Sequence, residues 1–549
     1  SKVTSTNSSS SVSADLIQIQ DTQDGRFDTF DVPESTKIGR VHRKCILAKT
    51  NEAGEIMSPY CVVHNGEITD KVVYLSAAEE NNKYIADWDE TFIDKNGEKK
   101  QFTLARYNGD IVTVDVDSIM YKKCSAYQDM SIAHACIPLP GHSNGKRITM
   151  ACNEYRQAVV TGKSERPYVN AGGESMLDSA YVTGRDILEF NGISRMCTIK
   201  CIGMKDDLQR RTYEFMLTDS SHSVIKYTVQ HNMMGSSNNL FSFELNVVDG
   251  LAYAPEDIVL HSNSYDAKES DVDIHGDFGK SGFDKNIFKT GLALANNINV
   301  VIKTCDGSTI DDACVISDRL IADDQLTHVF ISKVTATVSG SNQMFGCVTA
   351  DDKMTEMGVP ETGTWLCVGD PAISKIYIDE AGNRTNHFVR LGLGREGQVI
   401  GHTFYEKNDE SCVDVFIACR SAVEQGDKFA GRHGNKTVVA KILPAALMPY
   451  NPKTGFTADI CINPLGVPSR QNISQLLDIP LSYCMKLEGK RCVVAPYSSD
   501  DNAFVEAKLK EHGIDEEYFI DGRTGFYYDR PCFYGVISLL KLHHVVRSK

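Results

Sequence analysis

The strongest constraint on this chain is a basic, glycine-rich loop at Gly426–Lys436, set between two runs that are typical of β-strands. Val413–Cys419 and Thr437–Leu443 are rich in apolar and β-branched residues, which favours buried strands. The glycines let the loop backbone turn sharply and approach a ligand closely. Cations stand among them, and phosphate is the natural anion for such a loop. On composition alone, a solvated basic turn explains the loop equally well.

Three blocks in this part of the chain keep the order and spacing of a known family. They are Gly426–Lys436, Met448–Tyr450 and Asn463–Arg470. Together they resemble the GDK-AGRHGNKG, MPY and NPLGVPSR signatures of the β subunit of multisubunit DNA-directed RNA polymerases. Thr437 stands where that family usually has glycine. The resemblance runs from about Val62 to Arg547 and implies the C-terminal part of such a subunit.

The composition indicates a folded protein of several domains, with 42% apolar and 24% charged residues. A net charge of −16 disfavours a general nucleic-acid binder, but Gly426–Lys441 carries four basic residues against one acid. A basic site in an acidic protein suits a focused channel. The sequence contains no run of 18 apolar residues, so no membrane span is predicted. The 17 cysteines include no CxxC pair, which disfavours zinc and favours reduced, buried thiols.

Short β-type runs between Gly, Asn and Asp turns predict a mixed α/β, β-rich, multi-domain fold. Val112–Val116 alternates apolar and polar residues, as a half-buried strand does. Ser76 and Glu79 have the spacing of a capping box, which predicts that a helix begins there.

Two further helices are expected near the C-terminal end. Asn472–Leu477 places apolar side chains on one helical face, with Ser469 as the expected N-cap. Asp501–His512 should form a helix that ends at Gly513.

The resemblance implies a double-psi β-barrel with flap and hybrid-wall regions. The expected parts are a disordered tail at 1–15, a post-fork, lobe-side region with a hybrid-contacting segment at 16–157, an external and wall region at 158–285, the active-centre barrel at 286–320 and 421–500, a shortened flap at 321–420, and a segment contacting the β′-type subunit at 501–549.

The resemblance also assigns roles to individual residues. Lys428 and Lys436 would be catalytic and contact the RNA 3′-end phosphates and the reacting nucleotide. Arg147 and Arg523 would clamp the triphosphate, for which the fixed fork of a guanidinium is well suited. Residues expected to bind nucleic acid are Asn153, Arg156, Gln157, Arg432, His433, Asn435 and His544. Without the resemblance, the segment that carries Arg147 and Arg156 is more simply interpreted as an exposed basic helix. Arg523 is then a solvated arginine in an Asp-Gly turn.

Asp311 and Asp312 match the family pattern G-x-N-x-E-D-A-x-x-I-S, with Asp311 in place of the usual Glu. The resemblance implies that they serve a second Mg²⁺ indirectly. The main Mg²⁺ would be held by the β′-type partner, because the string NADFDGD is not found in this sequence. Taken alone, such an acidic pair is typical of a solvated turn.

The resemblance therefore predicts a subunit of a DNA-dependent RNA polymerase that transcribes DNA into RNA within a complex and is inactive alone. Expected partners are an N-terminal β-type polypeptide, β′-type polypeptides, a promoter-specificity subunit, template DNA, nascent RNA and NTPs, with no membrane. A chain that matches part of a β subunit looks like the split-subunit polymerases of jumbo bacteriophages. Such an enzyme would work in the cytoplasm of a bacterial host, with virion packaging left open.

Three alternatives stay open from the sequence. The chain could be a piece of a cellular β subunit. It could be a non-catalytic scaffold or regulator with a β-like fold, although the retained basic residues argue against this. It could also be a single-chain, two-barrel RNA-dependent polymerase, against which the missing NADFDGD string counts.

Overall fold

The computed structural model describes residues 2–4, 17–34, 38–159 without 52 and 95, 161–173 without 162–164 and 166, and 295–546 without 306, 340–341, 349–352, 408–409, 499–500 and 516. Between residues 174 and 294 it describes only the backbones of six strands. Most of the expected tail at 1–15 and of the expected external and wall region at 158–285 therefore lies outside the described residues. Lys2–Thr4 form strand β1, which pairs with β2 (Val41–Arg43), so this piece of the expected tail is a strand.

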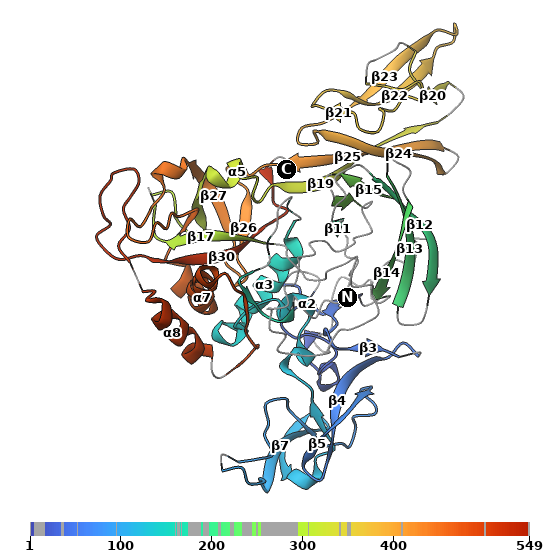
Figure 1. Cartoon of the computed structure of the whole chain (residues 1–549). Helices are drawn as coiled ribbons and strands as arrows, with labels where there is room; N and C mark the ends of the chain where they lie inside the picture. Colours follow the sequence, from blue (N-terminus) through green and yellow to red (C-terminus); the bar gives the residue numbers. More distant parts are fainter. Residues whose placement is uncertain are drawn as a thin grey trace.

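A closed barrel of six strands forms the left half of Figure 1. Around the barrel the order is β17 (Asn296–Ile302), β28 (Ile460–Ile462), β18 (Ala313–Ser317), β27 (Thr437–Leu443), β26 (Lys428–Ala430) and β30 (Phe533–Lys541). β17–β28 and β18–β27 are parallel pairs, and the other neighbours are antiparallel. Buried apolar side chains from all six strands, including Val300, Phe429 and Ile537, fill one core.

The barrel extends beyond the expected boundary at residue 500. β30 pairs with β17 from Asn296↔Leu539 to Ile302↔Phe533. The segment 501–549 therefore supplies a barrel strand, in addition to any contact that it makes with a partner. A run as apolar as Gly535–Leu540 needs a neighbour on each face, and the barrel provides it.

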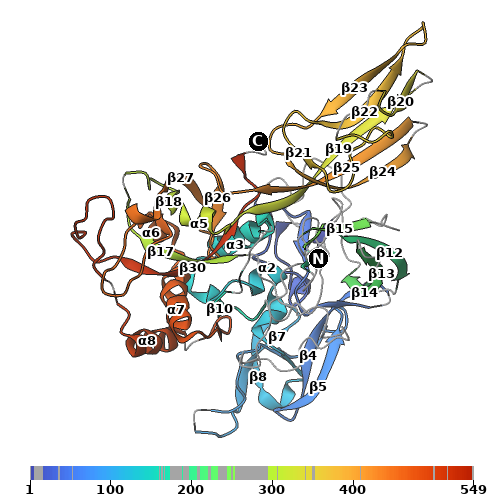
Figure 2. The same ribbon diagram turned by 45° about the horizontal axis from the view of Figure 1, so that its top comes forward.

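Between β18 and β26 the chain forms a separate β-lobe, which projects away from the barrel in Figures 1 and 2. Its strands are β19 (His328–Val338), β20 (Gln343–Phe345), β21 (Trp365–Leu366), β22 (Pro371–Ile378), β23 (Arg384–Arg390), β24 (Gly397–Lys407) and β25 (Glu410–Ser421). They form two sheets with a core of their own. The predicted strand Val413–Cys419 is confirmed, since it lies in β25 and is mostly buried.

The N-terminal region is a seven-stranded sheet. Its strands are β3 (Lys49–Thr50), β4 (Ile56–His64), β5 (Glu67–Leu75), β6 (Ile85–Ala86), β7 (Phe102–Tyr107), β8 (Asp110–Asp115) and β9 (Tyr121–Lys123). The strand predicted at Val112–Val116 is confirmed up to Asp115, where β8 ends, and its side chains alternate between exposed and partly buried. A further sheet, described as backbone alone, contains β11 (Leu188–Glu189), β12 (Cys197–Asp206), β13 (Arg210–Asp219), β14 (Val224–Asn232), β15 (Glu244–Val248) and β16 (Leu251–Tyr253).

The helix predicted to begin at Ser76 is wrong, although its capping box forms. The Glu79 carboxylate accepts the Ser76 N–H at 2.8 Å, and the Ser76 hydroxyl accepts the Glu79 N–H at 3.4 Å. The segment that follows is a turn, because Asn82 adopts a left-handed conformation with φ 60°. A single left-handed residue ends helical propagation.

The longer helices are α3 (Gly145–Gln157), α7 (Ser474–Glu488) and α8 (Asp501–His512). The shorter ones are α2 (Ile132–Ala135), α5 (Arg319–Ala322), α6 (Gly466–Arg470), η1 (Asp21–Gln23), η2 (Val116–Ser118), η3 (Ala126–Asp129), η4 (Pro140–His142) and η5 (Ala445–Leu447). Strands β10 (Val169–Asn170) and β29 (Cys492–Val493) pair in parallel. Across the described part of the chain, none of the helices has the length and apolar character needed to cross a bilayer.

The C-terminal helices partly match their predictions. α8 has the predicted bounds and is followed by Gly513 with φ 61°. The expected cap at Ser469 is wrong, because Ser469 lies inside α6, which ends at the left-handed Gln471. α7 then begins at Ser474 and packs against β30. Gly535 permits this approach, since a Cβ there would lie 2.4 Å from the Ile479 carbonyl oxygen.

Candidate functional site

Gln157, at the C-terminal end of α3, joins three segments that are far apart in the sequence. Its side-chain oxygen lies 3.4 Å from the Lys436 Nζ and 3.0 Å from the His544 Nε2. Its carbonyl oxygen accepts the His543 N–H at 2.9 Å. Both views show α3 beside the barrel edge at β26 and β30 (Figures 1 and 2). The structure thus brings the predicted Gln157, Lys436 and His544 together.

Lys428 begins β26, next to the same junction. Its carbonyl oxygen accepts the Leu542 N–H at 2.9 Å, which sets β26 against the segment that leads to His544. Strand alternation buries Phe429 in the barrel core and leaves Lys428 half-buried. The Lys428 ammonium makes no hydrogen bond or ion pair with any described residue, so it remains available to an anion.

The neighbouring Asp427 has a structural role. Its carboxylate lies 3.2 Å from the Lys541 Nζ, and both side chains are fully buried. The same carboxylate accepts the Val546 N–H at 3.0 Å. These contacts fix the base of the glycine-rich loop to β30 and to the residues after it.

Arg432 and His433 point into the protein. The Arg432 guanidinium donates to both carboxylate oxygens of Asp478 on α7 at 3.0 Å. The His433 Nε2 lies 2.9 Å from Asp478, and its Nδ1 lies 2.9 Å from the Ser474 hydroxyl. Arg432 is 1% and His433 2% exposed, so these two predicted nucleic-acid contacts instead anchor the loop on α7.

The charges in this anchor follow from burial and pairing. Burial alone would raise the pKa of Asp478, but the Arg432 charge and the hydrogen bonds from His433 and Ser482 hold it below its usual value. Burial lowers the pKa of His433, although Asp478 acts in the opposite direction. A neutral His433 then donates from Nε2 to Asp478 and accepts the Ser474 hydroxyl at Nδ1.

The middle of the loop rests on α3. Gly434 has φ 67°, and a Cβ there would lie 2.7 Å from the Arg147 carbonyl oxygen, so only glycine fits this approach. The Arg147 Nη1 reaches back to the Gly434 carbonyl oxygen at 3.5 Å. Asn435 donates to the Gln475 side chain at 3.1 Å, which leaves it half-buried. The predicted Arg147 therefore lies against the loop that carries Lys436.

The other predicted residues of α3 differ in their surroundings. The Arg156 guanidinium forms an ion pair with the fully buried Asp31, which holds it to the N-terminal region. Asn153 is half-buried on the same helix. Arg523 lies in a turn before β30. Its guanidinium binds Asp521 two residues away, with Nη2 2.9 Å from a carboxylate oxygen.

Glu154, on α3, is a site residue that no prediction named. It is 6% exposed, and its Oε2 has no hydrogen-bond partner among the described residues. Burial raises the pKa of Glu154 to about 8, although a backbone hydrogen bond from Lys436 and the charges of Lys436, Arg147 and Arg470 all act to lower it. A carboxyl group that is mostly neutral at pH 7 therefore lies among three cations.

Asp311 and Asp312 are exposed and do not make a metal site by themselves. The Arg470 guanidinium forms an ion pair with the Asp312 carboxylate. Asp311 has a left-handed φ of 50°, and its carbonyl oxygen accepts the Asn463 side chain at 3.2 Å. Because a cation already occupies Asp312, the pair does not fit a resident Mg²⁺ in this arrangement.

We call Arg147, Lys428, Lys436 and Arg470 the cation cluster. They come from α3, from both ends of the glycine-rich loop and from α6. Burial and the nearby Arg147 charge lower the pKa of Arg470, while Glu154 acts to raise it. This arrangement can bind and neutralise several phosphate oxygens at once.

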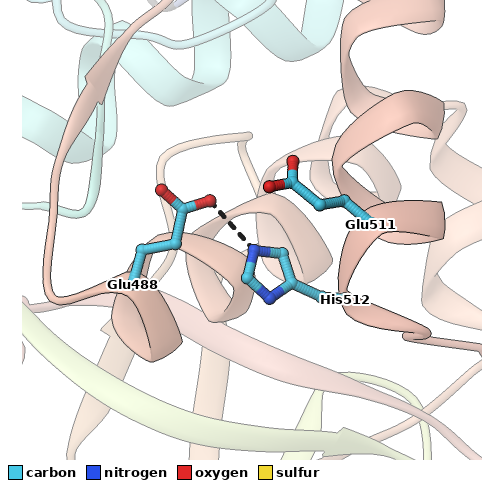
Figure 3. A group of neighbouring side chains, drawn as sticks. All are labelled: Glu488, Glu511 and His512. Carbon is cyan, nitrogen blue, oxygen red and sulfur yellow. Dashed lines mark hydrogen bonds and ion pairs between the residues drawn. The ribbon is translucent and has the colours of Figure 1, made fainter.

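A separate ligand-type group joins α7 to α8, and its members point toward one another in Figure 3. Glu488, Glu511 and His512 have ligand atoms within 4.8 Å of one another. The Lys508 Nζ lies 2.9 Å from Glu488 and 3.0 Å from Glu511, so a lysine already supplies the positive charge. The group is therefore an ion-pair network between the two helices.

Replacing Glu488 with glutamine should destabilise the chain modestly, by about 1 kcal/mol or less, because Glu488 and its partners Lys508 and His512 are partly exposed. Hydrogen bonds from His512 and Lys508 lower the pKa of Glu488 from 4.5 to about 2. A lowered carboxyl pKa contributes stability that is fully present above pH 4.5 and is lost as the pH falls toward 2. Thermal melting of both proteins should show a constant difference in stability between pH 7 and about pH 4.5, and a smaller difference at pH 3.5. A difference that grows on acidification would contradict this origin.

Comparisons with known proteins agree with this architecture. The family model described as "RNA polymerase Rpb2, domain 6" matches residues 217–549, more than half of the chain. The chain belongs to the RNA polymerase Rpb2 family. A second model, described as "RNA polymerase beta subunit external 1 domain", matches residues 60–125, N-terminal to the 158–285 expected to be the external region.

Bacterial relatives of the Rpb2 family cover nearly the whole chain. A protein of Borrelia garinii subsp. bavariensis named "DNA-directed RNA polymerase subunit beta" is 30% identical across 96% of this chain. The protein of the same name from Listeria welshimeri serovar 6b is 27% identical across 96%. This chain covers 46% and 45% of their lengths, so it spans about half the length of the relatives that it matches.

Two features of the sequence bear on contacts that were not predicted. Glu154 is the one acidic residue of α3, and an acid in a helix that also carries Arg147 and Arg156 was the available signal. Thr437 stands in a glycine position, and its hydroxyl donates to the Asp312 carbonyl oxygen at 2.7 Å. The glycine-rich loop is therefore held to the Asp311–Asp312 turn by a side-chain hydrogen bond that glycine cannot make.

Proposed function

We propose that this chain is a subunit of a multisubunit DNA-dependent RNA polymerase and that its cation cluster binds the phosphates of NTPs and of the RNA 3′ end. The observation that carries the proposal is that Gln157, at the end of α3, contacts both Lys436 and His544 in a chain of the Rpb2 family. Phosphoryl transfer needs positioning and charge neutralisation more than covalent chemistry. Rigidly held cations at a barrel edge supply both.

Each residue has a distinct task in this proposal. Lys428 and Lys436 neutralise charge at the reacting phosphates, and Arg147 holds the triphosphate. Gln157, His544, Asn153 and Asn435 contact nucleic acid around them. Arg523 is proposed as a further triphosphate clamp that exchanges its bond to Asp521 for a bond to phosphate. Arg432 and His433 position the loop, since both side chains are buried and bond to Asp478.

The remaining assignments rest on the family and on the topology. We infer that the closed barrel is the double-psi barrel of this subunit type, and that β19 to β25 form its flap. Mixed parallel and antiparallel pairing among strands from distant segments supports this assignment. Mg²⁺ would be held mainly by a β′-type partner, because the string NADFDGD is not found in this sequence and Asp312 is paired with Arg470. A promoter-specificity subunit, template DNA and nascent RNA would complete the assembly.

We also infer that the enzyme is of the split-subunit, jumbo-phage type and acts in a bacterial host. Identity near 30% to bacterial subunits and the departures at Asp311 and Thr437 support a strongly diverged member of the family. Affinity purification of the tagged chain from its native source, followed by mass spectrometry, should identify separate N-terminal β-type and β′-type chains. Recovery with a single full-length β′ chain of the host would contradict the split-subunit assignment.

Reconstitution tests the main proposal. The chain co-purified with its partner chains should make template-dependent RNA in Mg²⁺, while the chain alone should make none. RNA synthesis by a verified single-chain sample would contradict the need for partners. A complex that assembles but is unaffected by substitutions in the cation cluster would instead favour the scaffold interpretation.

A further inference from the structure

Glu154 is an unusual member of the phosphate site, because it brings a buried acid into a group of cations. It comes from α3, one turn before Gln157, and its side chain is almost completely buried. One of its oxygens, Oε2, has no hydrogen-bond partner among the described residues. A buried carboxylate in that state loses its hydration without full replacement, which favours the neutral form.

Opposing charges act on the same carboxyl group. They are Lys436 from the glycine-rich loop, Arg147 from α3 itself and Arg470 from α6. Together with the hydrogen bond from the Lys436 backbone, they favour the ionised form. Burial outweighs the cations and raises the pKa of Glu154 to about 8, and a change in either one shifts the proton on Glu154.

A phosphate ligand would change that balance. Phosphate oxygens bound to Lys436, Arg147 and Arg470 cancel the positive charge that stabilises an ionised Glu154, and they add negative charge nearby. We propose that Glu154 is a proton-linked positioning residue of the cation cluster, whose ionised fraction takes up a proton from solvent when phosphate binds. The proton adds to the Glu154 carboxylate and no other bond changes. This inference rests on the proposed function.

The size of the effect follows from the ionisation of the unliganded chain. With a pKa of about 8, Glu154 is about one-tenth ionised at pH 7 and about three-quarters ionised at pH 8.5. Phosphate binding should therefore take up about 0.1 proton at pH 7 and about 0.7 at pH 8.5. By linkage, affinity should fall up to about tenfold between pH 7 and pH 9.

The experiment is isothermal titration calorimetry of the full chain with a hexamer of adenosine that lacks terminal phosphates. Its phosphodiesters and adenines do not titrate between pH 7 and pH 9, so any proton uptake belongs to the protein. Titrations at low salt, in pairs of buffers with different ionisation enthalpies, give the number of protons taken up at each pH. Glu154→Gln and Glu154→Met remove the titrating group, and Glu506→Gln on the exposed side of α8 is the matched control.

The expected result is uptake of about 0.7 proton at pH 8.5 in the unsubstituted chain and in Glu506→Gln, and none in either Glu154 variant. Lys436→Ala should weaken binding of the hexamer at both pH values. Binding without proton uptake, or uptake that persists in the Glu154 variants, overturns this inference and leaves the phosphate site intact. No binding, or binding that Lys436→Ala does not weaken, overturns the phosphate site and this inference with it. Melting curves of the two Glu154 variants check that they are folded, and methionine serves if glutamine is poorly tolerated.

Discussion

Replacing Lys428 and Lys436 with alanine should slow RNA extension by the assembled enzyme while leaving assembly intact. If the two ammonium groups neutralise charge at the reacting phosphates, loss of either one should cost about 2–4 kcal/mol of transition-state stabilisation, or about 30- to 10³-fold in rate. The measurement is single-turnover extension of a pre-formed primer on template by the complete complex. Lysine to arginine should restore the rate only in part, because a planar fork does not replace a compact charge.

The assembly of these variants should be normal for a structural reason. Lys428 is half-buried and its side chain makes no hydrogen bond or ion pair with a described residue, and Lys436→Ala removes a long, 3.4 Å contact with Gln157 at a half-buried position. Lys453→Ala is the matched control, since that side chain is 74% exposed and pairs with Glu517 outside the cluster. Normal extension by the double Lys428→Ala, Lys436→Ala enzyme would refute the phosphate assignment and favour the scaffold interpretation.

Asp478→Asn should destabilise the chain more than any substitution at an exposed acid. The change removes the negative charge between Arg432 and His433 and leaves a fully buried guanidinium with a neutral partner. Removing one member of a buried ion pair typically costs about 3–5 kcal/mol. Urea unfolding at pH 7, followed by far-UV circular dichroism, measures the loss. Asp529→Asn at an exposed turn is the control and should change little.

The acid dependence of this anchor has a defined sign. The pKa of Asp478 is lowered in the folded chain, so its contribution is present above its ordinary value of 3.8 and is lost as the pH falls below that value. Asp478→Asn should therefore be most harmful near neutral pH. An Asn variant as stable as the unsubstituted chain at pH 7 would mean that the Arg432 pairing contributes no net stability.

Local features of the fold were predictable from the sequence, while long-range partners were not. The strands at Val112–Val116 and Val413–Cys419 and the helix at Asp501–His512 follow from periodicity and terminal residues, and the structure has all three. The helix at Ser76 failed because a capping box specifies how a helix begins and not whether it continues. β30 was assigned to another segment, since its partner β17 lies more than 200 residues away.

The site shows the same limit. The charge pattern of the glycine-rich loop predicted where its lysines lie but not which of its basic residues face inward. Arg432 and Lys436 look alike in sequence, yet Arg432 meets Asp478 from a helix 46 residues away. The charged surroundings of Glu154 are unpredictable for the same reason, because its neighbours Lys436 and Arg470 come from distant segments. Burial of charge is a tertiary property, and the local sequence does not encode it.

The pairing of β17 with β30 delays closure of the barrel during synthesis of the chain on the ribosome. Some 230 residues separate Ile302 from Phe533, and a ribosome adding about 5–20 residues per second needs roughly 10–50 s to make them. During that interval the first barrel strand has been synthesised but its antiparallel neighbour has not. A hydrophobic strand with an open edge is prone to pair with other chains. The nascent polypeptide should therefore depend on a chaperone, or on rapid capture by its assembly partners, until β30 emerges.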